Sequence, residues 1–323
     1  MWAGGGGPHG GVSFVVDVAG DGGGIRYKKG MELLWKHRRG VMDLTHHGRI
    51  MGVLNVTPDS FSDGGQFVNL EQAVGHGLAM VEAGAAIIDL GGESTRPGAG
   101  AVSADEQIRR TRPVIAALRE CSDVLISIDT SVAAVAEAAL AAGADIVNDV
   151  TGLRGDPEMA GLCARTGAGV VVMHMQGEPR TMQAAPQYED VVREVGQFFA
   201  MQMEVALAAG VAAEAVVFDP GIGFGKSLEH NLTLIRELGR ILPSGLFRPI
   251  LLGVSRKSFL GRVLGSDDLA DRAWPTVALT ALGREKEARL FRVHEVGPNV
   301  QALAMTEAVR AMAPRAATGT GVG

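Results

Sequence analysis

Polar side chains follow eight short apolar runs in this sequence, and residues of these types could bind a flat, nitrogen-rich ligand. The deepest of them are expected to be Asp129, Asn148 and Asp219. Buried carboxylate and amide groups discriminate strongly between ring ligands, because a mismatched ring leaves a buried polar group unpaired. We therefore expect these three side chains to bind the edge of a heterocycle.

A second group of polar residues is cationic and falls near the same positions. Its members are Arg96, Lys226, Arg256, Lys257, Arg292 and His294. Six potential cations on one face of an acidic protein favour an anionic ligand, with phosphate or diphosphate as the natural candidate. One alternative is structural, in which Asp129, Asn148 and Asp219 only pair with Lys257 and Arg292. Another treats each Asp or Asn as a helix cap.

The apolar runs that precede these polar residues are typical of buried parallel strands, because they are short and apolar on both faces. They cover residues 50–54, 86–90, 124–128, 145–147, 169–173, 215–218, 250–254 and 289–293. The segments between them have helical signals. These are a capping-box spacing from Ser103 to Glu106, an Ala-rich stretch 131–142 followed by Gly143, the pair Asp156-Pro157, and amphipathic stretches at 188–209 and 228–242.

This alternation predicts an α/β fold, a single (β/α)₈ TIM barrel over residues 49–315, rather than an open doubly wound sheet. In a closed barrel, the C-terminal ends of all strands converge on one mouth, where such enzymes place their active sites. Eight polar strand ends in register are hard to explain as helix caps alone. The barrel therefore brings the heterocycle-binding and anion-binding residues together.

The two ends of the chain lie outside this pattern. Residues 1–48 begin as a flexible Gly-rich extension and continue as a basic lead-in, and residues 316–323 are expected to be a disordered tail. The basic segment 25–49 could contact nucleic acid or a membrane. A solvated lead-in is the preferred interpretation, because 30 Lys and Arg against 36 Asp and Glu give the chain a net charge of −6.

Composition excludes several classes of protein. Hydrophobic residues are 46% and charged residues 20% of the 323, which is typical of a globular protein and not of a disordered one. Cys121 and Cys163 are the two cysteines, too few for a disulfide scaffold. No apolar run approaches the roughly 18 residues of a membrane span, and no secretory signal is visible, so we expect a cytoplasmic protein.

The segment 221–227, GIGFGKS, resembles a phosphate-binding loop only superficially. That motif needs a glycine five residues before the Gly-Lys pair, and position 220 is proline. We expect the glycines to let the backbone approach a ligand closely, with Lys226 at the rim. His174 and His294 are isolated, so the sequence shows no histidine cluster for a metal.

Two long motifs are similar to the signatures of the dihydropteroate synthase family of pterin-binding TIM barrels. They are MGVLNVTPDSFSDGG at residues 51–65 and IDLGGESTRPG at residues 88–98. Shorter matches follow in order at 127–130, 147–152, 173–177, 219–226, 255–258 and 292–294. The resemblance runs from about residue 49 to the last helix, and family members are (β/α)₈ barrels.

The resemblance implies a folate-pathway transferase. The reaction would join 4-aminobenzoate to (7,8-dihydropterin-6-yl)methyl diphosphate and give 7,8-dihydropteroate and diphosphate. It would be assisted by Mg²⁺ and pass through a dissociative, cation-like transition state. The resemblance also implies small-molecule partners alone, without nucleic acid or membrane, and a homodimer of the kind that sulfonamides target.

The resemblance assigns roles to residues by motif. The implied pterin-binding residues are Asp129, Asn148, Met173, Asp219, Gly223, Lys257 and Arg292, with Arg292 stacking on the ring. The implied diphosphate-binding residues are Asn55, Thr95, Arg96, Arg292 and His294, and Asn55 is also the implied Mg²⁺ ligand. The implied aminobenzoate-binding residues are Phe61, Thr95, Pro97, Phe224, Lys257 and Ser258. The implied catalytic residues are Asp129, Asp219, Lys257 and Arg96.

One position departs from the family pattern, and two rival functions stay open. Glu295 stands where the family usually has Asp, and we expect little effect because the charge is kept. A methyltetrahydrofolate:corrinoid methyltransferase-like barrel would share the pterin-holding residues but lack the two long loop motifs. A non-catalytic, synthase-like pterin-binding paralogue would have lost loop residues such as Asn55, Thr95 or Arg96, and all three are present.

Overall fold

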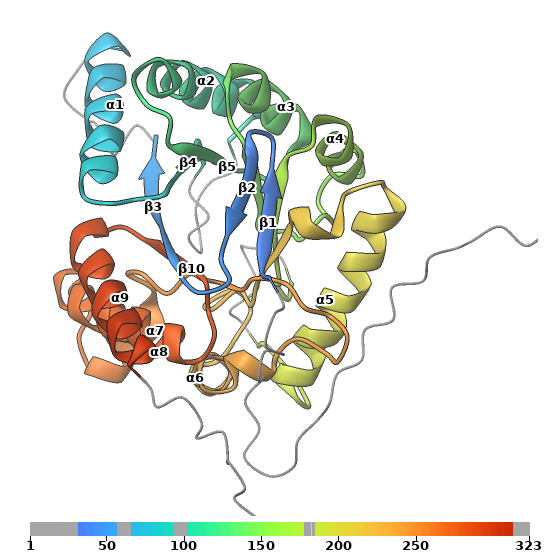
Figure 1. Cartoon of the computed structure of the whole chain (residues 1–323), viewed down its shortest axis with the longest axis vertical. Coiled ribbons are helices and arrows are strands. Elements are labelled where there is room, and N and C mark those ends of the chain that lie inside the picture. Colours follow the sequence, from blue (N-terminus) through green and yellow to red (C-terminus); the bar gives the residue numbers. More distant parts are fainter. Residues whose placement is uncertain (1–31, 57–65, 94–101, 178–181, 183–184, 313–323) are drawn as a thin grey trace, which may run out of the picture.

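Eight parallel strands form the centre of the structure, a computed structural model that describes residues 32–56, 66–93, 102–177, 182 and 185–312. In spatial order they are β8 (Val216–Asp219), β7 (Gly169–Met173), β6 (Ile146–Asp149), β5 (Leu125–Asp129), β4 (Ile87–Gly91), β3 (Arg49–Asn55), β10 (Leu290–Val293) and β9 (Leu251–Leu252). A β-bridge between Phe218 and Ile250 joins the two ends of the sheet. The predicted (β/α)₈ barrel is confirmed (Figure 1).

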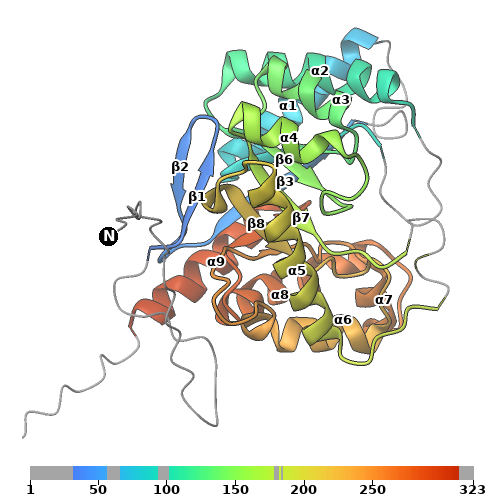
Figure 2. The ribbon, with the colours of Figure 1, turned by 90° about the vertical axis from the view of Figure 1, so that its right-hand side faces the viewer.

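Helices surround the strands (Figures 1 and 2). The α-helices are α1 (Gln66–Glu82), α2 (Ala104–Cys121), α3 (Ala133–Ala142), α4 (Glu158–Thr166), α5 (Val191–Ala208), α6 (Leu228–Arg236), α7 (Ser258–Leu264), α8 (Ala273–Glu285) and α9 (Val296–Ala311). Short 3₁₀ turns cover Ala213–Ala215, Leu238–Arg240 and Ala270–Arg272. Among the described residues, no helix is both long and apolar enough to cross a membrane.

Local capping chemistry defines several helix boundaries. Ser103 caps α2 by accepting from the backbone N–H of Glu106, whose carboxylate binds Arg109 and Arg110, so the structure shows only this half of the predicted capping box. Gly143 ends α3 in the left-handed conformation with φ 117°, as predicted. The amphipathic stretch 188–209 becomes helical only at Val191, since Asp190 is the cap. The stretch 228–242 is shorter than predicted, and a 3₁₀ turn follows α6.

Side chains inside the barrel form layers, because inward-facing residues along a strand are two positions apart. An apolar layer contains Met51, Ile87, Ile146, Val171, Val217, Leu251 and Leu290. Two residues further along, toward the C-terminal ends of the strands, lie Val53, Asp89, Ser127, Asn148, Met173, Asp219, Gly253 and Arg292. We call this second set the polar layer. The outer faces of the strands instead pack against the helices in a separate apolar cluster.

A hairpin of β1 (Leu34–His37) and β2 (Gly40–Asp43) covers the N-terminal end of the barrel (Figure 2). Trp35 is fully buried against the apolar layer together with Leu33 and Leu44, and its Nε1 donates to the carbonyl of Ala215 at 2.9 Å. The expectation of a solvated lead-in is therefore wrong for this hairpin. The basic residues around Trp35 masked its role as a hydrophobic plug.

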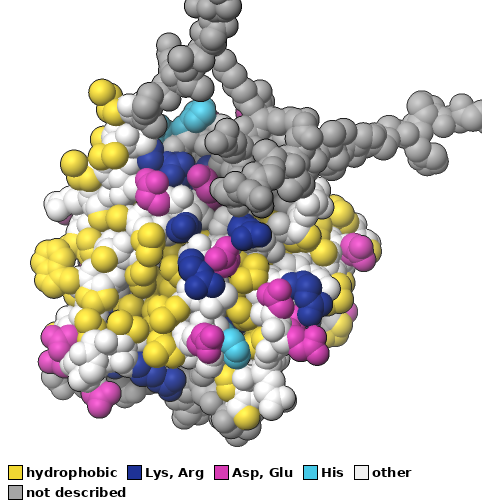
Figure 3. Space-filling model, turned by 90° about the horizontal axis from the view of Figure 1, so that it is seen from below, with side chains coloured by type: hydrophobic (Ala, Val, Ile, Leu, Met, Phe, Trp, Pro, Cys, Tyr) yellow, Lys and Arg dark blue, Asp and Glu magenta, His cyan; other side chains and the backbone are white. Residues whose placement is uncertain are grey.

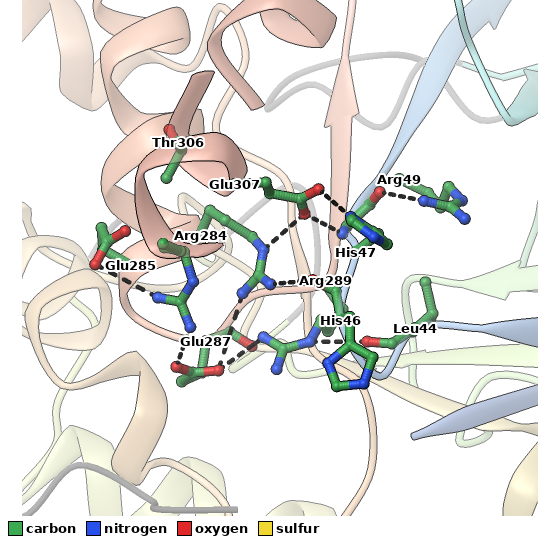
Figure 4. A network of polar contacts seen from close by, with 12 residues as sticks. Leu44, His46, His47, Arg49, Arg284, Glu285, Glu287, Arg289, Thr306 and Glu307 are labelled. Atoms are coloured by element: carbon green, nitrogen blue, oxygen red, sulfur yellow. Dashed lines mark hydrogen bonds and ion pairs between the residues drawn. The ribbon is translucent and has the colours of Figure 1, made fainter. Parts of the chain in front are cut away.

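Ion pairs fasten the segment after the hairpin to the last helices (Figure 4). Glu307 on α9 accepts from Arg284 Nε at 2.9 Å and lies 2.7 Å from Nδ1 of His47. Arg284 Nη2 donates to the carbonyl of His46 at 2.8 Å, and Arg289 Nε donates to that of Leu44 at 2.9 Å. These bonds connect the segment after the hairpin to α8, to α9 and to the residue that precedes β10.

Candidate active site

Three strand residues predicted to bind a heterocycle lie together in the barrel. Asn148 and Asp219 are buried in the polar layer, and Asp129 is buried two residues above Ser127 at the C-terminal end of β5. Asp219 Oδ1 accepts from the backbone N–H of Gly221 at 2.7 Å. Parallel strands place these side chains at one end of the barrel, as the sequence predicts.

Arg292 links this group through two carboxylates. Its Nη2 donates to Asp129 Oδ2 at 2.7 Å and its Nε donates to Asp89 Oδ2 at 2.6 Å. Asn148 Nδ2 donates to the same oxygen of Asp89 at 3.1 Å. The two bonds fix the plane of the Arg292 guanidinium. Of the pairs that the structural alternative requires, the ion pair between Asp129 and Arg292 is present in the fold.

Some buried oxygens of the site have no protein hydrogen-bond partner among the described residues. They are Asp89 Oδ1, Ser127 Oγ and Asp129 Oδ1. A buried polar atom that lacks a partner costs about 1–3 kcal/mol, so such atoms are rare except where a ligand or water meets them. Asp129 Oδ1 in particular needs a donor at this depth, which suits a ligand with an N–H group.

Burial perturbs the ionisable groups of the site. It raises the pKa of Asp129 to about 7, against the attraction of Arg292, and it also raises the pKa of Asp219, against Lys257. Burial lowers the pKa of Lys257 to about 8, although Asp219 opposes the shift. For Arg292, burial lowers the pKa, but Asp89 and Asp129 outweigh it and raise it above the ordinary value. Groups perturbed in this way cluster at functional sites.

The glycine-rich loop after β8 packs on the loop after β7. A Cβ on Gly221, whose φ is 64°, would lie 1.9 Å from the carbonyl oxygen of His174, and one on Gly225 would lie 2.2 Å from that of Gln176. The expectation that the glycines approach a ligand is therefore corrected at these two positions. Gly223 differs, because its neighbour is the Lys257 side chain, at 3.2 Å.

Lys226 is buried and is not a cation of the rim, which corrects the sequence-based expectation. Its Nζ donates to the carbonyl of Phe224 at 2.9 Å and to that of His174 at 3.3 Å, and it lies 2.9 Å from Nδ1 of His174. Burial lowers the pKa of Lys226 well below its ordinary value, and the three acceptors match the three N–H donors of its ammonium form. Burial and the adjacent Lys226 lower the pKa of His174 to about 2, which keeps the imidazole a neutral acceptor. Lys226 thus joins two loops.

An apolar wall borders the polar layer on the β7 and β8 side. Met173, Met175, Met182 and Phe224 form one buried cluster. Lys257 Nζ lies 4.6 Å from the centroid of the Phe224 ring and donates to the carbonyl of Ile222. Ser258 is exposed and begins α7. An aromatic ring next to Lys257 and beside an exposed serine is suited to a small aromatic acid.

The remaining predicted residues divide into two groups. Asn55 is half-buried at the end of β3, and His294, after β10, has its Nδ1 3.0 Å from Ser255 Oγ. Phe61, Thr95, Arg96 and Pro97 lie outside the described residues. Within the described part of the chain, no three His, Cys, Asp or Glu side chains are arranged to hold a metal ion.

Two relationships were not found from sequence. Asp89 lies in the second motif, but it received no role, although its position two residues after Ile87 was a signal that it faces the barrel interior. Arg256, a predicted rim cation, pairs with Glu295, with 2.7 Å from Nε to Oε1. The residue that departs from the family pattern therefore neutralises one of the cations counted toward an anionic ligand.

Comparison with known proteins agrees with this geometry. A sequence profile described as "Pterin binding enzyme" matches residues 51–294. The dihydropteroate synthase of Synechocystis is 45% identical over 260 residues, which cover 80% of this chain and 89% of that protein. The chain belongs to the dihydropteroate synthase family.

Solved structures of dihydropteroate synthases have the same fold as this family member. The enzyme of Yersinia pestis, in a sulfonamide drug complex, is 42% identical with a TM-score of 0.80, covering 86% of this chain and all of that one. The enzyme of Xanthomonas albilineans with 4-aminobenzoic acid is 42% identical with a TM-score of 0.78, covering 84% and 96%. The match spans nearly the whole length of these enzymes, so the resemblance seen in the motifs is confirmed.

Proposed function

We propose that this chain synthesises 7,8-dihydropteroate from 4-aminobenzoate and (7,8-dihydropterin-6-yl)methyl diphosphate. The amine nitrogen forms a bond to the pterin methylene carbon, the carbon–oxygen bond to diphosphate breaks, and diphosphate leaves with the electron pair. The amine releases its extra proton to solvent. The observation that carries the proposal is the buried Oδ1 of Asp129 beside Arg292, which has no protein partner among the described residues, in a chain of this family.

The pterin ring is proposed to bind in the polar layer. Asp219, Asp129 and Asn148 offer acceptors for ring N–H groups, and Lys257 offers a donor for a ring carbonyl. Met173 supplies an apolar surface for one face, and Gly223 leaves space beside Lys257. Arg292 contributes positive charge at the diphosphate end.

Departure of diphosphate leaves positive charge on the pterin methylene carbon, and this chain supports that charge. Asp129 and Asp219 are buried carboxylates on the proposed pterin site, where a low dielectric strengthens their interaction with a cation. The arylamine then attacks the carbon. No protein nucleophile is needed in such a dissociative path.

We propose that 4-aminobenzoate binds above the pterin, between Phe224, Lys257 and Ser258, with Phe61, Thr95 and Pro97 completing the pocket. The Phe224 ring and the Lys257 ammonium are adjacent, which suits a ring that bears a carboxylate. Sulfonamides, which resemble 4-aminobenzoate in shape and charge, would compete for this pocket.

Magnesium and the diphosphate are proposed to meet at Asn55. Mg²⁺ is commonly bound by one or two protein oxygens together with substrate phosphates. The amide oxygen of Asn55 suits this arrangement, and the described residues offer no acidic cluster that would hold the ion alone. The ion would neutralise charge on the diphosphate leaving group. The diphosphate oxygens would also be bound by Arg292, His294, Thr95 and Arg96.

A homodimer is proposed through the face formed by the last helices. Exposed apolar side chains gather there (Figure 3), and they include Val263, Leu264, Leu269, Trp274, Leu282, Met305, Val309 and Met312. Trp274 is 76% exposed, which is unusual for so large an apolar side chain unless a partner covers it. A Trp274→Asp variant would run as a monomer in analytical ultracentrifugation. We also propose a cytoplasmic location, which agrees with two free cysteines.

The proposed function is tested by diphosphate release from the purified chain given the pterin diphosphate and Mg²⁺, with and without 4-aminobenzoate. Release that depends on 4-aminobenzoate and matches dihydropteroate formation would support a synthase. Tight pterin binding without product would instead point to a non-catalytic paralogue. Methyl transfer from methyltetrahydrofolate to a corrinoid would indicate the other rival.

A further inference from the structure

Asp89 connects two other members of the polar layer, Asn148 and Arg292. It is completely buried on β4, and its Oδ2 accepts from both Arg292 Nε, at 2.6 Å, and Asn148 Nδ2, at 3.1 Å. Its Oδ1 has no protein partner among the described residues. Asp89 is thus the shared acceptor of two residues to which the proposed function gives contacts with the pterin substrate.

The bond to Asn148 decides which way the asparagine amide faces. A side-chain amide has an NH₂ end that only donates and an oxygen end that only accepts. The oxygen that Asn148 meets is a carboxylate oxygen already accepting from Arg292 Nε, so it can only be faced by the NH₂ end. The amide oxygen of Asn148 is therefore turned away from Asp89 and is held as an acceptor.

We propose that Asp89 is a positioning residue that sets the ligand selectivity of the proposed pterin site by holding the Asn148 amide in one orientation. The inference rests on the proposed function, since it requires that Asn148 face the pteridine ring. With the amide fixed, this site selects a 2-amino-4-oxopteridine. It rejects the 2,4-dioxo counterpart, in which the donors and acceptors of one ring edge are exchanged. Asp89 acts through Asn148 and does not touch the ring.

The variant that tests this is Asp89→Asn, which keeps the shape of the side chain. An asparagine at this position can offer either an oxygen or an NH₂ group to Asn148, so both orientations of the Asn148 amide become possible. The loss of charge also affects Arg292, which keeps its bond to Asp129. That change weakens or strengthens both pteridines together, and the ratio of their affinities is therefore the informative quantity.

Asp145→Asn provides a matched control. Asp145 is equally buried, and its Oδ2 also has two donors, Arg119 Nη2 at 2.6 Å and the backbone N–H of Ile126 at 3.0 Å. It precedes β6, at the end of the barrel opposite the polar layer. The control therefore removes the same charge from a buried aspartate–arginine pair without touching Asn148.

Fluorescence titration with a 2-amino-4-oxopteridine and its 2,4-dioxo counterpart measures the ratio directly, without turnover. We expect Asp89→Asn to reduce the preference for the amino compound about tenfold, the worth of one hydrogen bond, and Asp145→Asn to leave it unchanged. If the ratio of the two affinities is unchanged in Asp89→Asn, whether or not both affinities change by the same factor, the proposal is overturned.

A second variant keeps the test valid if Asp89→Asn does not fold. Asn148→Ala should lower the preference by a similar factor, and adding Asp89→Asn to it should change the ratio no further, because Asp89 acts through Asn148. Full selectivity in Asn148→Ala would overturn the proposal. Product formation by the unmodified chain is measured separately, so a failure of the proposed function is distinguished from a failure of this inference.

Discussion

Arg292 Nη2 donates to Asp129 Oδ2 at 2.7 Å, so two residues that the family resemblance assigns to the same ligand are bonded to each other. Only one oxygen of the Asp129 carboxylate takes part, and the other has no protein partner among the described residues. The ion pair therefore holds Asp129 in place and leaves one oxygen for a donor from the ligand.

Asp129→Asn is expected to lower affinity for the pterin diphosphate at least about tenfold while the barrel stays folded, because a carboxylate accepts ring N–H bonds more strongly than an amide oxygen. Isothermal titration calorimetry measures the affinity, and Asp145→Asn serves as the control for the loss of a buried charge. An unchanged dissociation constant would show that Asp129 is structural.

The same variant has a predicted signature in the pH dependence of stability. Burial raises the pKa of Asp129 from its ordinary value of 3.8 to about 7 in the folded chain. The folded state then binds the proton more tightly, so this group makes unfolding easier as the pH rises from about 4 to 7. Denaturant titrations at pH 5 and pH 8 should show a smaller decline in Asp129→Asn, and equal declines would argue against the raised pKa.

The lowered pKa of Lys257 predicts that kcat/KM for the pterin diphosphate falls at alkaline pH. Its pKa is lowered by burial to about 8, so the ammonium that we assign to a ring carbonyl is lost as the pH rises above that value. We expect kcat/KM for the pterin diphosphate to fall above pH 8. Because arginine stays protonated, Lys257→Arg should remove this fall of kcat/KM above pH 8, even if the variant is slower at every pH. If the fall persists in Lys257→Arg, another group is responsible for it.

Gly221→Ala is expected to destabilise the fold by about 3 kcal/mol or more and to abolish activity. The new methyl group would lie 1.9 Å from the carbonyl oxygen of His174, in a residue with φ 64°. Gly297→Ala is the control, since nothing lies within 4 Å of its Cβ and it sits in α9, where alanine is favoured by up to about 1 kcal/mol. Chemical denaturation of both variants compares their free energies of unfolding. Equal values for Gly221→Ala and Gly297→Ala would show that Gly221 tolerates a side chain.

Trp35→Ala tests the plug. Loss of a fully buried tryptophan should cost about 3–5 kcal/mol of unfolding free energy and leave the Ala215 carbonyl without its donor. The activity of the folded fraction should be unchanged, because the plug lies at the far end of the barrel. Val41→Ala, on β2 and 56% exposed, should have little effect on either quantity. A marked loss of turnover in folded Trp35→Ala would contradict this separation.

The barrel was predictable from sequence because its strands are read from local patterns. Short runs such as 169–173 are apolar on both faces, and the polar residue after each run marks the C-terminal end. The hairpin was not predictable in this way. Trp35 lies among basic residues, and its burial depends on a contact with Ala215, which is 180 positions away.

The sequence predicts which residues belong to the site better than it predicts the hydrogen bonds between them. The positions of the strand ends predicted correctly that Asp129, Asn148 and Asp219 are buried in the barrel. This was possible because every second residue of a strand faces the barrel interior. The roles of Lys226 and Asp89 depend on which groups they meet across the barrel. A lysine after three glycines suggests a rim, whereas the structure buries it between two loops. Pairing of this kind has no local signal.

The sealed base has a kinetic consequence. Among the described residues, Trp35, Leu33 and Leu44 fill one end of the barrel, so we expect substrates and products to share the opposite end. In our assignment the pterin lies below 4-aminobenzoate, so the pterin diphosphate has to arrive first, and an early 4-aminobenzoate would block its path. We expect dihydropteroate to leave by the same end, past the apolar wall that contains Phe224 and Met175. We therefore expect ordered addition, with inhibition by excess 4-aminobenzoate, to follow from the single open end of the barrel as well as from chemical affinity.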